Sequence, residues 1–162
     1  GKKVAAVFVL IISFGNSLIK QVAADLASEM STLTTFVTLS PIPGLSKWCA
    51  EEGRSLPDMN NPEIARGTAA HYLLNAKARD HQPFDPVARF HLGNGAMIHA
   101  IHAGADISDK GMAQSGGTMV NYLYDLDQVE INHELYVSTR EVVASAEVKT
   151  LAKDGKRHCE EK

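Results

Sequence analysis

The first 39 residues restrict the possible folds more than any other part of the sequence. An apolar run rich in β-branched side chains covers residues 4–12, and a second apolar run covers residues 33–39. Between them, apolar side chains recur at helical spacing up to Met30, and Asn16 or Ser17 opens this helix. Continuous apolar runs are typical of strands buried in a parallel sheet, and a helix joins such strands in a right-handed crossover. The pattern predicts two neighbouring parallel strands with a helix between them.

The beginning of the chain also has the layout of a signal peptide. Lys2 and Lys3 precede the apolar run of residues 4–12, which is the order of the charged and hydrophobic regions of a leader. The run is shorter than the roughly 20 residues needed to span a bilayer. No small-x-small cleavage site follows it at the right place. We therefore expect a buried strand here rather than a leader or a membrane segment.

Length, charge and cysteine content limit the functional classes. The 162 residues suit one domain, and 16 basic against 19 acidic side chains give a net charge of −3. This mild acidity argues against a nucleic acid or an anionic membrane as the main partner. The two cysteines, Cys49 and Cys159, lie far apart and form neither a CxxC motif nor a disulfide-rich scaffold. A reducing compartment, the cytoplasm, is the expected location.

Two short runs are candidates for chemistry. In FHLGNGA, residues 90–96, His91 precedes a turn framed by two glycines, which can hold an imidazole at the mouth of a cleft. A buried structural histidine before a hairpin turn is the alternative. In TLSPIPG, residues 38–44, an apolar strand stops at Ser40, which two prolines follow. Because open sheets bind ligands at the carboxyl ends of their strands, Ser40 is a candidate site residue; a hydroxyl bonded to its own turn is the alternative.

The rest of the chain predicts alternating helices, strands and loops. Pro62 is expected in the first turn of a helix that ends near Ala78. His99 and His102 are an odd number of residues apart in a strand, so they are expected on opposite faces, and no metal site is expected. The other expectations are loops at 46–61, 80–86 and 111–117, a strand–turn–strand unit at 90–101, strands at 96–102 and 118–124, helices at 125–134 and 140–153, and a charged, frayed tail from Asp154.

Several runs in a fixed order carry a resemblance to a known family. They are ISFGN (12–16), LIKQV (18–22), LSPIPG (39–44), FHL with NGA (90–96), QS with a glycine two residues later (114–117), MVNYLYDL (119–126), NHE (132–134) and VVAS (142–145). Together these runs span most of the chain, and they resemble the catalytic domain of malonyl-CoA decarboxylases.

The resemblance implies an acetyltransferase-like (GNAT-type) α/β fold, in which a mixed twisted sheet flanked by helices clamps acyl-CoA. It implies that residues 1–153 are the C-terminal portion of a catalytic domain, hence a partial domain, and that residues 154–162 are a charged tail. The first strands of the catalytic domain and a preceding helical domain are expected to be missing, and a homo-oligomer is expected to form through that helical domain.

The resemblance also implies an enzyme that cleaves malonyl-CoA to acetyl-CoA and CO₂, in fatty acid metabolism, without a metal or organic cofactor. Ser40 and His91 match the family's catalytic serine and histidine, and Tyr124 matches a tyrosine of its active site. Loss of CO₂ leaves a thioester enolate, which needs an oxyanion donor and a proton for the α-carbon. His91 is the expected proton donor near pH 7, and Ser40 the proton acceptor or the hydrogen-bond partner of the malonyl carboxylate.

Part of the family's CoA pyrophosphate loop is matched just before the first helix. A strand that leads into a helix N-terminus presents free N–H groups, which suit a phosphate. The matching residues are Ile12, Ser13, Phe14, Gly15 and Asn16.

Two other functions stay open at the level of sequence. A chain that keeps these motifs without the other half of the cleft could be a non-catalytic acyl-CoA-binding or assembly fragment. The same fold also suits an acyl-CoA-dependent acetyltransferase that passes an acyl group to an amine, although no residue of the chain indicates an acceptor channel or its base.

Overall fold

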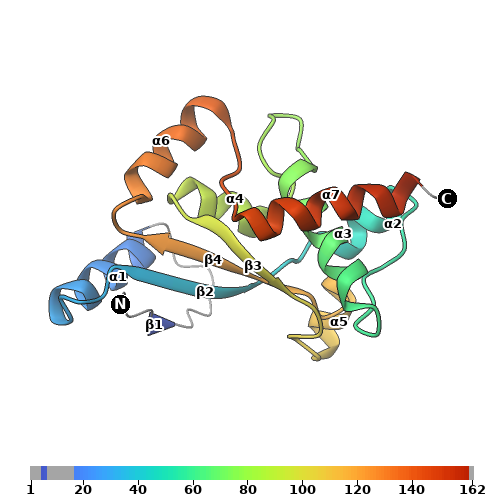
Figure 1. The fold of residues 1–162 in the computed structure, drawn as a ribbon, viewed down its shortest axis with the longest axis horizontal. Coiled ribbons are helices and arrows are strands. Elements are labelled where there is room, and N and C mark those ends of the chain that lie inside the picture. The colour runs from blue at the N-terminus through green and yellow to red at the C-terminus, as the bar shows by residue number, and fades with distance from the viewer. Residues whose placement is uncertain (1–4, 7–16, 161–162) are drawn as a thin grey trace.

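The computed structural model of the chain describes residues 5–6 and 17–160. Within these residues, four strands form one sheet in the order β1 (Ala5–Ala6), β2 (Thr35–Pro41), β4 (Met119–Asp125) and β3 (Met97–His102). The helices are α1 (Ser17–Glu29), α2 (Leu45–Glu51), α3 (Pro62–Asn75), α4 (Pro86–Gly93), α5 (Asp109–Ser115), α6 (Val129–Thr139) and α7 (Ala146–Glu160). The chain is thus a mixed sheet flanked by helices (Figure 1), which confirms the expected α/β class.

The strand–helix–strand pattern at the start of the sequence is confirmed where the structure describes it. β1 runs parallel to β2, with Ala5 beside Phe36 and Ala6 beside Val37. The helix between them, α1, begins at Ser17 as its capping signal predicts. The rest of the first expected strand, residues 7–12, lies outside the described residues.

β4 is the centre of the antiparallel part of the sheet. It pairs with β2 along its whole length, from Thr35 opposite Asp125 to Pro41 opposite Met119, and with β3 on its other side. Every second side chain of β4 is buried, because alternate residues of a strand face the same side of a sheet. This spacing places Tyr122 and Tyr124 on the same buried face.

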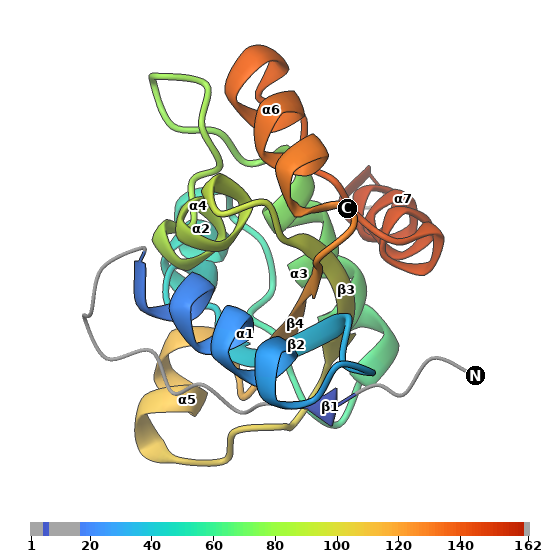
Figure 2. The same ribbon diagram turned by 90° about the vertical axis from the view of Figure 1, so that its left-hand side faces the viewer.

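Two long helices, α3 and α7, pack along each other and contact β3. Figures 1 and 2 both show them side by side. Gly67 and Gly155 lie at their contact, where a Cβ on Gly155 would overlap the carbonyl oxygen of Gly67. The small size of Gly155 therefore sets how closely the two helices approach.

Two expected loops are wrong because each contains a short helix. In α2, the buried side chains of Leu45, Trp48 and Cys49 recur at helical spacing, and they anchor a segment that otherwise looks polar. In α5, the hydroxyl of Ser108 accepts a hydrogen bond from the Gly111 N–H at 3.1 Å. The side-chain cap stabilises a helix where glycine-rich sequence predicted a loop.

The strand–turn–strand unit expected at 90–101 is wrong in its first half. His91 lies in α4, a helix that the Asp85 side chain caps and that Pro86 begins. Gly95, with φ of 86°, then leads from α4 into β3. The strand expected at 96–102 is confirmed as β3, so only the conformation before the glycines differs.

The last two helices begin later than expected. Arg140 ends α6 in a left-handed conformation, and residues 143–145 run beside β3, where Ile98 N–H donates to the Val143 carbonyl at 2.9 Å. α7 then begins at Ala146 and continues to Glu160. Residues 154–160 are therefore helical rather than a frayed tail, because Gly155 packs against α3.

His99 and His102 are both exposed in β3. The pairing of β3 with β4 is irregular between Ile98 and Ala100, and this interrupts the two-residue alternation on which the expectation of opposite faces rested. Among the described residues, no three side chains of the metal-binding types lie close enough to hold an ion. In the same residues, none of the helices combines the length and apolarity that crossing a membrane requires.

Candidate active site

A buried imidazole and a serine hydroxyl meet at the end of β2. Ser40 is the last residue but one of that strand, and its side chain is 2% exposed. His91, in the last turn of α4, is fully buried. The Ser40 Oγ lies 3.3 Å from the His91 Nε2, although the two residues are 51 positions apart in sequence. The strand end that the sequence indicated therefore faces a group able to exchange a proton with its hydroxyl.

Tyr124 contacts the other nitrogen of the same imidazole. Its hydroxyl, from β4, lies 2.5 Å from the His91 Nδ1, and its ring meets the imidazole at an angle of 67°. In one tautomer, Nε2 accepts from Ser40 and Nδ1–H donates to Tyr124; in the other, Nε2–H donates to Ser40 and Tyr124 donates to Nδ1. Either way, the two hydroxyls hold the ring in one orientation.

Two further side chains complete this cluster. Thr38, two residues before Ser40 on the same face of β2, has its Oγ1 3.0 Å from the Ser40 Oγ. Tyr122, two residues before Tyr124, stacks on the His91 imidazole with ring centroids 4.2 Å apart and planes 18° apart. Its buried hydroxyl has no hydrogen-bond partner among the described residues. The imidazole is thus enclosed by aromatic surface and contacted by hydroxyls.

The burial of the cluster decides its charge. Burial lowers the pKa of His91 to about 3 and raises the pKa of Tyr124 above its ordinary value. At neutral pH the imidazole and the phenol are therefore both uncharged. The site can exchange protons between neutral groups, and a negatively charged ligand beside it would favour the imidazolium form of His91.

Comparison with known proteins identifies the family of the chain. The model of the malonyl-CoA decarboxylase C-terminal domain matches residues 9–64 and 59–162. The chain belongs to the malonyl-CoA decarboxylase family.

Relatives of known name agree with this assignment. In an alignment 184 positions long, the chain is 32% identical to the mitochondrial malonyl-CoA decarboxylase of Rattus norvegicus. In an alignment of 181 positions, it is 30% identical to that of Anser anser anser. These alignments cover 86% and 85% of this chain, but only 37% and 36% of the two relatives. The chain therefore spans little more than a third of the length of the curated relatives it matches.

Solved structures of the family share the fold. The malonyl-CoA decarboxylase of Rhodopseudomonas palustris superposes with a TM-score of 0.77 at 37% identity, over 91% of this chain and 42% of that one. The enzyme of Agrobacterium vitis gives a TM-score of 0.76 at 41% identity, over 86% and 40%. These matches confirm the fold class that the resemblance implies.

The structure brings together Ser40, His91 and Tyr124, the three residues that the resemblance nominated for the active site. The candidate CoA loop, Ile12, Ser13, Phe14, Gly15 and Asn16, lies outside the described residues. Sequence reasoning missed Thr38 and Tyr122. The two-residue repeat of a strand could have found both, since each lies two positions from a nominated residue.

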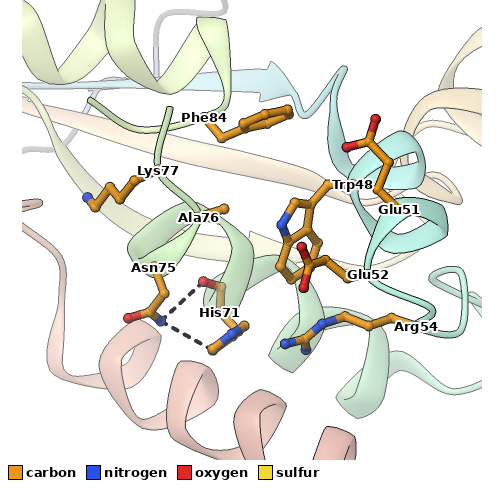
Figure 3. Close-up of a pocket in the computed structure, with 9 residues that line it drawn as sticks. All are labelled: Trp48, Glu51, Glu52, Arg54, His71, Asn75, Ala76, Lys77 and Phe84. Carbon is orange, nitrogen blue, oxygen red and sulfur yellow. Dashed lines mark hydrogen bonds between the residues drawn. The ribbon is translucent and has the colours of Figure 1, made fainter. Parts of the chain in front are cut away.

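A separate pocket lies between α2, α3 and the segment that follows α3 (Figure 3). It has a volume of about 350 Å³ and includes none of the residues that contact His91. Trp48 forms one wall, with the guanidinium of Arg54 4.6 Å from its ring centre. The other lining residues are Glu51, Glu52, His71, Asn75, Ala76, Lys77 and Phe84. Two acidic and two basic side chains line this pocket, so its net charge favours neither sign of ligand.

Proposed function

We propose that this chain provides catalytic residues for the decarboxylation of malonyl-CoA to acetyl-CoA and CO₂. The observation that carries the proposal is the His91 imidazole held between the hydroxyls of Ser40 and Tyr124, at 3.3 Å and 2.5 Å, in a member of this family. The relatives bear the name malonyl-CoA decarboxylase, which supplies the substrate and the reaction.

The chemistry requires one proton for each CO₂ released. The carboxylate of malonyl-CoA is attached to the carbon next to the thioester. When the bond between the carboxylate and that carbon breaks, CO₂ leaves and the electron pair moves toward the thioester oxygen as an enolate. Protonation of the α-carbon then gives acetyl-CoA. The thioester carbonyl itself takes up the electron pair, so we propose that the reaction needs no metal or organic cofactor.

We assign the protonation step to His91. Burial alone keeps its imidazole neutral, but the negative charge of a malonyl carboxylate or an enolate beside it would favour the protonated form. The proton consumed in each turnover comes from water and reaches His91 before the imidazole protonates the α-carbon. Ser40 passes this proton on, as its acceptor and then its donor, or donates a hydrogen bond to the malonyl carboxylate, and Tyr124 orients the ring through Nδ1. A positioned acid contributes about 10² to 10⁴ in rate, or roughly 3 to 5 kcal/mol.

We also propose that residues 12–16, which precede α1 in the sequence, bind the substrate's CoA. Backbone N–H groups and the helix dipole at such a junction favour a pyrophosphate. Homo-oligomer formation and a cytoplasmic location stay predictions, as does the absence of nucleic acid or membrane partners.

The test is release of acetyl-CoA from malonyl-CoA by the protein that contains this sequence. His91→Asn keeps hydrogen-bonding atoms but removes the titrating ring, so kcat should fall by about 10²-fold or more with CoA affinity largely kept. Ser40→Ala should also lower kcat. His99→Asn and Ser138→Ala change an exposed histidine and an exposed serine, and they should leave kcat unchanged.

Two outcomes would contradict the proposal. If His91→Asn and Ser40→Ala turn over as fast as the parent, the catalytic assignment is wrong. If the parent binds CoA but releases no acetyl-CoA, the chain is a non-catalytic acyl-CoA-binding protein. Transfer of acetyl groups to an added amine, without release of CO₂ from malonyl-CoA, would indicate an acetyltransferase instead.

A further inference from the structure

Asp85 is a buried carboxylate that the proposed chemistry does not use. It is 1% exposed and lies at the N-cap of α4, the helix that carries His91. Its Oδ1 accepts hydrogen bonds from the N–H groups of Val87 at 2.9 Å and Ala88 at 3.0 Å. One oxygen of the carboxylate is therefore fully occupied in fixing the start of α4.

The second oxygen of Asp85 points to two other segments. Oδ2 accepts from the Tyr72 hydroxyl of α3 at 3.2 Å and, at the longer distance of 3.5 Å, from the N–H of Gly44. Gly44 lies four residues after Ser40 and is the N-cap of α2. A single carboxylate thus joins the segment that leaves Ser40, helix α3 and the helix that carries His91.

Four donors converge on the Asp85 carboxylate, but burial outweighs them, and the pKa of this carboxyl lies above its ordinary value. Burial raises the pKa of this carboxyl, and the N–H groups of Ala88, Gly44 and Val87 and the Tyr72 hydroxyl lower it. Burial and the Asp85 charge together raise the pKa of Tyr72, so Tyr72 stays a donor. A carboxylate with this number of donors is costly to replace, because each donor would be left buried without an acceptor.

The contact between Gly44 and Tyr72 leaves no room for a side chain at position 44. A Cβ on Gly44 would overlap the Tyr72 hydroxyl, although the φ of Gly44, −94°, is open to any residue. Tyr72 cannot move aside easily, because two aromatic rings pack against its ring. The ring centroid of Trp48 lies 5.1 Å from that of Tyr72, and the ring centroid of Phe84 lies 6.2 Å from it. Trp48 and Phe84 also line the pocket in Figure 3.

We infer that Asp85 is a positioning residue, whose carboxylate sets the distance between the Ser40 Oγ and the His91 Nε2 by holding the segment after β2 and the start of α4 together. The expected effect on kcat rests on the proposed function, whereas the expected effect on the position of His91 does not. A displacement of about 1 Å between reacting groups can cost about 10²-fold in rate. The link therefore acts on kcat rather than on substrate affinity.

The direct test is Asp85→Asn. The variant keeps the volume and one acceptor oxygen, which can still cap α4, but places an amide group where Gly44 N–H needs an acceptor. We expect kcat for acetyl-CoA release to fall roughly 10- to 100-fold with KM within about twofold. We also expect the His91 imidazole ¹⁵N resonances to shift, which needs no turnover. Asp80→Asn is the matched control, since Asp80 is an exposed aspartate that accepts from Gln82 in a turn.

A rescue pair tests the same geometry without changing Asp85. Gly44→Ala should lower kcat and shift the His91 resonances, because its methyl group meets the Tyr72 hydroxyl. Tyr72→Phe removes that oxygen, so the double variant Gly44→Ala/Tyr72→Phe should recover the kcat and the spectrum of Tyr72→Phe alone. If Asp85→Asn fails to fold, this pair decides the question.

The inference is overturned if Asp85→Asn keeps the parent's kcat and His91 resonances, or if the double variant is no better than Gly44→Ala. If the parent releases no acetyl-CoA while Asp85→Asn still shifts the His91 resonances, the positioning role is supported and the proposed function fails. The two conclusions are thereby separated.

Discussion

The stability of the protein should depend on pH through His91. Burial lowers the pKa of this imidazole from 6.5 to about 3 in the folded state, whereas the unfolded chain exposes it to water. Between pH 6.5 and about 3, His91 therefore binds a proton in the unfolded state but not in the folded state. The stabilisation is complete above pH 6.5 and is lost as the pH falls from there toward 3. Between pH 7 and pH 5, the loss from this one group is roughly 2 kcal/mol of unfolding free energy.

The measurement is urea unfolding of the parent and of His91→Asn at pH 7 and pH 5. The variant has no titrating group at this position, so its unfolding free energy should fall by about 2 kcal/mol less than that of the parent over the same interval. His99→Asn removes an exposed histidine of β3 and should retain the pH dependence of the parent. Equal pH dependence in the parent and in His91→Asn would refute the argument that burial keeps this imidazole neutral.

Two further predictions follow from individual contacts. Tyr124→Phe removes the hydrogen bond to His91 Nδ1, so kcat for acetyl-CoA release should fall roughly fivefold with KM little changed, since a typical hydrogen bond contributes about 1 kcal/mol. Tyr136→Phe is the control, because its hydroxyl contacts Gln82 instead, and a parent-like rate for Tyr124→Phe would contradict the role of Nδ1. Gly155→Ala forces α3 and α7 apart and should lower the unfolding free energy by about 1 to 3 kcal/mol in denaturant titration. An unchanged midpoint would show that the two helices separate without cost.

The elements that were predicted correctly are those with strong local signals. The helical spacing before Met30 predicted α1, and Pro62 in a first turn predicted the start of α3. The apolar run at 33–39 predicted the strand that becomes β2. These patterns are local because hydrophobic periodicity and the φ restriction of proline act within one element.

The wrong predictions concern short helices and one turn. In α2 and α5, the polar residues and glycines predict loops, and only a few buried side chains at helical spacing indicate the short helices. The helix that carries His91 was assigned to a strand because the glycines after it predict a hairpin equally well. Its N-cap at Asp85 was the signal available in the sequence, since aspartate before proline is typical of a helix start.

For the candidate site, the ordered motifs by themselves determined the family and nominated Ser40, His91 and Tyr124. Only the tertiary structure decided that the three side chains meet. The 51 positions between Ser40 and His91 are bridged by the packing of α4 near the end of β2, and the pairing of β2 with β4 brings Tyr124 to the same imidazole. The tertiary structure also decided that His91 is neutral, because a pKa depends on how completely folding removes water from the group, and no local sequence pattern encodes that burial.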